Sequence, residues 1–171
     1  MRRFGIAGWS GSGKTTLVRR LLPELIGRGI VVSTVKHAHH DFDVDRPGKD
    51  SYEHRMAGAK EVLVASSVRW ALMHEIKGEI ETSLDDLVER MTPVDLLLIE
   101  GFKSESYHKL EVHRPSIGKK LLYVDDADVV ALASDAPVEG TELRVLDLDN
   151  VAEIADFIIA HCGLDASRGE T

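Results

Sequence analysis

The chain has 171 residues, a formal net charge of −8 and a single cysteine, Cys162. This length allows one domain with a sizeable core, and a lone cysteine excludes both a disulfide framework and a thiolate metal cluster within one chain. The negative charge argues against nucleic acid and anionic membranes as partners, because both bind proteins through a basic face.

The first predicted element is a short strand from Arg3 to Gly8, whose apolar residues are typical of a strand buried on both faces of a parallel sheet. The basic N-terminal residues are followed by this strand and not by the apolar segment of a signal peptide. No stretch approaches the roughly 18 apolar residues of a membrane span. We therefore expect a soluble, cytoplasmic protein.

The strand leads into Gly8-Trp9-Ser10-Gly11-Ser12-Gly13-Lys14-Thr15, which matches the phosphate-binding pattern G-x-x-x-x-G-K-[ST] of a P-loop. Apolar residues then recur at helical spacing from Thr15 to a stop at Gly29. Pro23 lies inside this pattern and should kink the helix or end its first half. A strand before the loop and a helix after it favour a nucleotide site over a simple glycine-rich turn.

Each position of this phosphate loop has an expected task. The glycines allow the backbone to bring its amides against a β-phosphate at the start of a helix. Lys14 would span the β- and γ-phosphates, and the Thr15 hydroxyl would help to coordinate Mg²⁺. The residues expected to contact the nucleotide here are Gly8, Ser10, Gly11, Ser12, Gly13, Lys14, Thr15 and Thr16.

A β-branched run from Ile30 to Val35 predicts the second strand, and a loop rich in His, Asp, Pro and Gly follows from Lys36 to Asp50. Its imidazoles and carboxylates are consistent with a transition-metal site, or with a polar loop that senses the γ-phosphate or meets a partner, and we favour the second interpretation. The candidate residues of this switch or partner loop are His37, His39, His40, Asp41, Asp45, Lys49 and Asp50.

The central part of the chain predicts a short helix from Ser51 to Ala57, closed by Gly58. Two β-like runs, Glu61 to Ala65 and Arg69 to Ile76, are separated by a tight turn and predict an antiparallel hairpin. A capped helix beginning at Ser83 comes next.

The most apolar strand is predicted from Val94 to Ile99, which places Glu100 at its C-terminal end, where ligands bind open α/β sheets. This run is similar to a Walker B strand with Glu in place of Asp. Glu100 is therefore a candidate metal ligand with Thr15 and a candidate catalytic residue with Lys14. The alternative is that Glu100 only caps the junction between strand and loop.

Further strands are predicted in the last third of the chain, followed by an amphipathic helix from Val151 to His161. These strands are Lys109 to Val112, Leu121 to Val124, Val129 to Ala133 and Val145 to Leu148. Strands that alternate with helices around a P-loop predict an α/β protein with the P-loop NTPase fold, in which helices flank a mostly parallel sheet and an antiparallel β-hairpin is inserted. We expect a single nucleotide-binding domain over residues 1–163 and a flexible tail over residues 164–171.

Asp135 follows the strand ending at Ala133-Ser134 and could accept hydrogen bonds from the guanine N1 and N2 donors, which adenine lacks. The usual guanine motif has a lysine two residues before its Asp, where this chain has Ala133. A turn residue ahead of Pro137 is the slightly favoured alternative on chemistry alone.

Several of these segments together resemble one family, the molybdopterin-guanine dinucleotide biosynthesis adaptor proteins, MobB. The segments are Gly8 to Thr16, Val35-Lys36-His37 with His39-His40-Asp41, Asp45 to Ser51, Ala57-Gly58-Ala59, Ile99 to Lys103, and Ala133-Ser134-Asp135. The resemblance implies a homodimer that binds GTP with Mg²⁺ and hydrolyses it weakly. It also implies that the protein assists the nucleotidyltransferase that attaches GMP to molybdopterin. Molybdopterin itself is a further candidate ligand. The resemblance raises Asp135 as a base-recognition candidate.

Two other functions stay open at this point. One is a P-loop small-molecule kinase that passes the γ-phosphate to an acceptor held by the His-rich loop. The other is a metal-delivery GTPase that binds its metal through His37, His39 and His40, against which the absence of a Cys-rich segment counts.

Overall fold

The computed structural model describes residues 1–38, 42–78, 80–102 and 105–165. The chain divides into two compact units, the first formed by residues 1–37 and 91–171 and the second by residues 38–90. The prediction of one nucleotide-binding domain over residues 1–163 stays a prediction. Most of the predicted tail, residues 166–171, lies outside the described residues.

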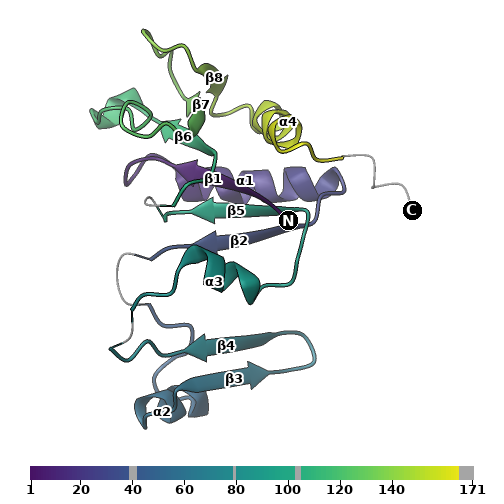
Figure 1. Ribbon diagram of the computed structural model, residues 1–171, viewed down its shortest axis with the longest axis vertical. Helices are drawn as coiled ribbons and strands as arrows, with labels where there is room; N and C mark the ends of the chain where they lie inside the picture. Colours follow the sequence, from purple (N-terminus) through teal and green to yellow (C-terminus); the bar gives the residue numbers. More distant parts are fainter. Residues whose placement is uncertain (39–41, 79, 103–104, 166–171) are drawn as a thin grey trace. The chain divides into compact units, whose positions relative to one another are not determined.

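The described part of the first unit contains a six-stranded sheet in the order β2-β5-β1-β6-β7-β8, and every neighbouring pair is parallel. The strands are β1 (Arg2–Ala7), β2 (Val32–Lys36), β5 (Leu96–Glu100), β6 (Lys109–His113), β7 (Val129–Ser134) and β8 (Arg144–Asp147). β1 lies inside the sheet between β5 and β6 (Figure 1). Parallel strands have their C-terminal ends at one edge, so the segments that follow β1, β5, β6 and β7 lie near one another.

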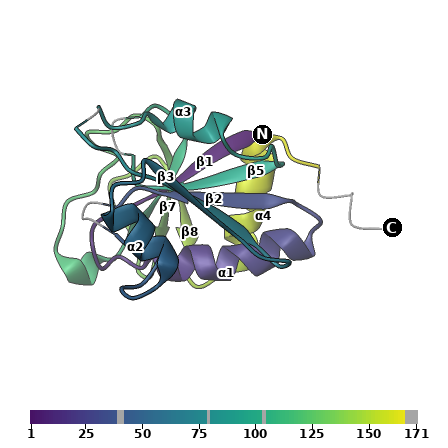
Figure 2. The same cartoon turned by 90° about the horizontal axis from the view of Figure 1, so that it is seen from below.

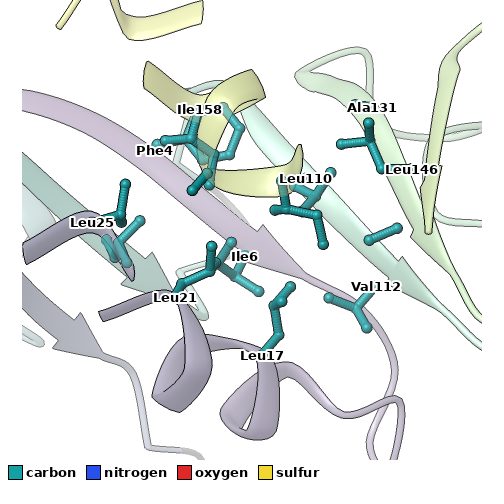
Figure 3. Packing of buried hydrophobic residues seen from close by; sticks show 14 of the residues in the cluster. Phe4, Ile6, Leu17, Leu21, Leu25, Leu110, Val112, Ala131, Leu146 and Ile158 are labelled. Atoms are coloured by element: carbon teal, nitrogen blue, oxygen red, sulfur yellow. The ribbon is translucent and has the colours of Figure 1, made fainter. Parts of the chain in front are cut away.

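Two helices, α1 (Lys14–Gly27) and α4 (Val151–Cys162), pack side by side on one face of this sheet (Figure 2). Leu17, Leu21 and Leu25 recur at helical spacing along α1 and are fully buried. They meet Ile158 of α4 and apolar strand residues such as Ile6 in one core (Figure 3). This core fixes the start of α1, and therefore the end of the phosphate loop, against the sheet.

α1 continues through Pro23 to Gly27 as one helix. Pro23 is exposed, which keeps its ring away from the packed face of the helix. The helix therefore does not end in its first half.

The predicted strand from Leu121 to Val124 is wrong, because residues 122–125 form a bend followed by a turn. The physical reason is Glu111 in β6, whose carboxylate is fully buried. It accepts hydrogen bonds from the backbone amide of Leu122 at 2.8 and 3.0 Å and from that of Tyr123 at 3.1 Å. The Glu111 side chain thus accepts the hydrogen bonds that these amides would donate to a neighbouring strand if the segment were itself a strand.

The second unit contains α2 (Asp50–Met56), the antiparallel pair β3 (Glu61–Ala65) and β4 (Trp70–His74), and α3 (Leu84–Glu89). The predicted hairpin is therefore confirmed. Ser83 caps α3 as expected, because its Oγ accepts a hydrogen bond from the Asp86 amide at 3.2 Å. Within the described ranges, no helix is both long enough and apolar enough to cross a membrane.

Candidate functional site

The phosphate loop, residues 8–15, connects the C-terminal end of β1 to the start of α1. The loop glycines have positive φ values, of 142° at Gly8, 82° at Gly11 and 102° at Gly13. Residues other than glycine rarely adopt this backbone conformation. A Cβ atom on Gly8 would lie 2.6 Å from both Ser12 Oγ and the Val112 carbonyl oxygen. The loop thus requires glycine at Gly8 both for its backbone conformation and for its close contact with β6.

Two polar side chains of the loop point to its chemistry. Lys14 Nζ donates hydrogen bonds to the carbonyl oxygens of Gly8 at 2.9 Å and of Trp9 at 3.0 Å, so the lysine lies across the loop. The Ser12 residue is only 2% exposed, and its Oγ has no hydrogen-bond partner among the described residues. A buried hydroxyl without a partner is unusual in a stable fold and is consistent with a polar ligand in the loop.

Thr15 and Glu100, the predicted metal ligands, lie next to each other. Thr15 Oγ1 is 3.2 Å from Glu100 Oε1 and 3.4 Å from Oε2. The pairing of β1 with β5 places Ile6 opposite Glu100, so the carboxylate stands one strand away from the phosphate loop. Lys36 Nζ lies 3.6 Å from the same Oε1. A hydroxyl and a carboxylate at the end of parallel strands are an oxygen set suited to Mg²⁺.

The opposite side of the phosphate loop is occupied by Arg114, which follows β6. Its Nε donates to the Ser12 carbonyl oxygen at 3.0 Å. Its Nη1 forms an ion pair with Asp135 Oδ2. Arg114 is not among the predicted site residues, although it directly follows β6, as Asp135 directly follows β7. Its position beside Asp135 follows from the register of β6 and β7, which pairs His113 with Ser134.

A second contact from the segment after β6 reaches Trp9 within the loop. Trp9 Nε1 donates to the Lys120 carbonyl oxygen at 2.7 Å, and Lys119 Nζ lies 5.7 Å from the centroid of the indole ring. The same segment is also held by Glu111, which binds the amides of Leu122 and Tyr123 just after Lys120. The phosphate loop is therefore braced by the chain that follows β6.

The predicted switch or partner loop is only partly described, and His39, His40 and Asp41 lie outside the described residues. His37 lies beside the end of β5, because its amide donates to the Glu100 carbonyl oxygen at 2.8 Å. Its ring centroid is 4.8 Å from that of Phe102. A Cβ atom on Gly101 would be 2.6 Å from His37 Cβ, so the close contact requires glycine at Gly101.

The remaining residues of this loop belong to the second unit. The Asp45 side chain is 6% exposed and forms an ion pair with Arg55 at 2.8 Å. Hydrogen bonds to Asp45 and Asp43 raise the pKa of the Arg55 guanidinium. Asp50 begins α2 directly after Lys49. Among the described residues, no cluster of three His, Cys, Asp or Glu side chains could hold a metal ion.

Comparisons with known proteins agree on one family. The family model described as molybdopterin guanine dinucleotide synthesis protein B, MobB, matches residues 4–135. A molybdopterin-guanine dinucleotide biosynthesis adapter protein of Escherichia coli (strain K12) is 47% identical over 159 residues, which cover 91% of this chain and 90% of that protein. The protein of the same name in Haemophilus influenzae is 45% identical over 157 residues, covering 91% and 86%. A crystal structure of molybdopterin-guanine biosynthesis protein B matches with a TM-score of 0.73 and 30% identity, covering 94% of this chain and 99% of that one.

Proposed function

The chain belongs to the molybdopterin guanine dinucleotide synthesis protein B family, and from this premise we propose that it binds GTP with Mg²⁺ and hydrolyses it slowly. The resemblance read from the sequence and the expected P-loop NTPase fold are both confirmed. The family role is that of an adapter in molybdopterin guanine dinucleotide biosynthesis. The nucleotide, the metal and the hydrolysis are the steps that we add.

The observation that carries the nucleotide site is the pairing of the glycine-rich loop with Glu100. The amides at the start of α1 offer positive potential to an anion, and Lys14 adds a full charge beside them. Ser12 supplies a buried hydroxyl without a partner among the described residues. These groups would hold the β- and γ-phosphates, because they concentrate hydrogen-bond donors at one end of the sheet.

Thr15 and Glu100 fit a Mg²⁺ ion, since their oxygens already approach within 3.2 Å. When bound, Mg²⁺ would neutralise charge on the β- and γ-phosphates. Lys14 would stabilise charge that develops on the phosphate oxygens, and Glu100 would orient the metal or the attacking water. The low rate of hydrolysis is what the resemblance to the family implies.

The choice of guanine rests on the guanine dinucleotide named in the family's role. Asp135 stays a candidate base-recognition residue because it follows β7, on the side of the phosphate loop opposite Glu100. The ion pair with Arg114 gives Asp135 a competing partner.

An apolar face of the β3–β4 hairpin supports the homodimer. Leu63 and Leu72 are paired across the strands and are 62% and 46% exposed, and Trp70 beside them is 67% exposed. Exposed apolar groups gathered on one strand face are typical of protein interfaces. We propose that this face serves a second copy of the chain, while the nucleotidyltransferase that attaches GMP to molybdopterin is the heterologous partner.

Calorimetric titration with GTP and ATP, each with Mg²⁺, tests the nucleotide proposal. We expect tighter binding of GTP than of ATP and loss of binding in Lys14→Ala. Arg20 lies on the same helix as Lys14, and Arg20→Ala, which removes its exposed ion pair with Asp149, should leave affinity unchanged. Equal affinity for GTP and ATP would refute the guanine preference. Unchanged binding by Lys14→Ala would refute the site.

A product assay separates slow hydrolysis from a small-molecule kinase. We expect free phosphate from GTP both alone and with candidate pterins present, and a phosphorylated pterin would contradict the adapter assignment. Equilibrium sedimentation of Leu72→Asp tests the dimer, because a carboxylate on the hairpin face should give a monomer. Co-purification with the nucleotidyltransferase tests the heterologous partner.

A further inference from the structure

The ion pair between Arg114 and Asp135 joins two strand ends to the outer side of the phosphate loop. Arg114 follows β6 and Asp135 follows β7, and the two strands are in register through His113 and Ser134. The guanidinium binds the Asp135 carboxylate through Nη1 and the Ser12 carbonyl oxygen through Nε at 3.0 Å. One planar group therefore bridges the loop and β7.

The guanidinium also lies close to Gly13, the glycine that directly precedes α1. An added Cβ on Gly13 would be 3.5 Å from Arg114 Nε and 3.7 Å from Nη2. Gly13 has a left-handed conformation, with φ of 102°, and directly precedes Lys14. Arg114 thus binds the backbone of Ser12 and lies close to Gly13, in the part of the loop whose amides would face a phosphate group.

Both side chains are partly shielded from water, with 34% of Arg114 and 28% of Asp135 exposed. A carboxylate already paired with a guanidinium has fewer lone pairs and less negative charge to offer to the N1 and N2 donors of guanine. Asp135 is thus better placed to act on the loop than on a base.

We propose that Asp135 is a positioning residue that acts through Arg114: the carboxylate holds the guanidinium against Ser12 and Gly13 and so keeps the phosphate loop in its binding conformation. The proposal rests on the proposed nucleotide site. It differs from base recognition in what it predicts, because a loop that is held less firmly binds the phosphates of every nucleotide less well. The preference between bases is then unaffected.

The variants Asp135→Asn, Arg114→Gln and the double variant test this, with titration of GTP, ATP and pyrophosphate, each with Mg²⁺. We expect each single variant to weaken all three ligands by about fivefold, the range of a partly exposed ion pair. The ratio of GTP to ATP affinity stays unchanged. The double variant is no weaker than either single variant, because the two residues act as one unit.

A matched pair of controls is available in Asp149→Asn and Arg20→Gln. These residues form a more exposed arginine–aspartate pair at 3.1 Å in the same unit, with Arg20 on α1 and Asp149 just before α4. We expect their affinities for all three ligands to equal that of the unmodified protein. Asp135→Glu, which keeps the charge, should recover most of the affinity lost in Asp135→Asn.

Two results would overturn the proposal. In the first, Asp135→Asn lowers the GTP to ATP ratio while pyrophosphate binds normally, so that Asp135 reads the base. In the second, the effects of the single variants multiply in the double variant, so that the residues act independently. If the unmodified protein binds no nucleotide, the proposed function fails, and amide hydrogen exchange of the free protein decides the positioning role. Exchange at Gly13 and Lys14 should be faster in Asp135→Asn and Arg114→Gln, and unchanged exchange would refute it.

Discussion

Replacing Glu111 by alanine should destabilise the protein strongly, because this fully buried carboxylate holds a segment that has no strand partner. It binds the amides of Leu122 and Tyr123 at 2.8 to 3.1 Å. A hydrogen bond to a charged group contributes about 1.5 to 3 kcal/mol, so the loss of two amide partners should cost about 3 to 6 kcal/mol of unfolding free energy. Glu111→Gln keeps one carbonyl acceptor and should cost about half of that.

Urea unfolding gives the free energies, and amide hydrogen exchange shows whether the cause is the one named. Leu122 and Tyr123 should lose protection in Glu111→Ala, while amides inside β1 should lose only what the lower global stability implies. Glu139→Gln changes an exposed carboxylate elsewhere and should be neutral. A cost below about 1 kcal/mol for Glu111→Ala, or normal protection of Leu122 and Tyr123, would refute this role of Glu111.

Three further predictions concern the site, pH and α1. Glu100→Gln should weaken GTP binding in the presence of Mg²⁺ but not with EDTA, measured by calorimetry, and an equal loss in both would exclude a role in metal binding. Burial and the neighbouring His108 lower the pKa of His161 below the ordinary histidine value of about 6.5. Near and below that pH, His161 therefore binds more protons in the unfolded chain than in the folded one. Stability in urea should therefore fall as the pH drops from 7 to 5, and His161→Gln should flatten that slope; an unchanged slope would contradict this. Pro23→Ala should raise stability by about 1 kcal/mol, because it restores a helical amide at an exposed position. Thermal unfolding measures this, and a lower melting temperature than that of the unmodified protein would contradict it.

Local patterns were sufficient for much of the fold. The spacing of Leu17, Leu21 and Leu25 predicts the buried face of α1, and the glycines of the phosphate loop mark its sharp turn. The run that ends at Glu100 is apolar on both faces because the strand lies inside the sheet. Glu100 could thus be found from sequence, since a single charged residue ends a fully apolar strand.

Contacts between strand ends could not be predicted in the same way, because they depend on strand order. Arg114 lies near Ser12 only because β6 is the neighbour of β1, and no local pattern states this. The error at residues 121–124 has a related origin: Leu121-Leu122-Tyr123-Val124 has the composition of a strand, but the buried carboxylate of Glu111, in the preceding strand, binds the amides of Leu122 and Tyr123. Side chains that bind the backbone of another segment are the features that a single sequence conceals.

The chain contains two tryptophans, Trp9 and Trp70, and the structure places one in each compact unit. They are therefore built-in fluorescent labels that need no dye. Trp70→Phe leaves only the indole of the phosphate loop, whose N–H is bonded to the Lys120 carbonyl, and its emission then follows that loop alone. Trp9→Phe leaves only the exposed indole of the hairpin, whose emission shifts to shorter wavelength when that face is covered. Two single-tryptophan proteins thus separate optically the events at the phosphate loop from those at the hairpin.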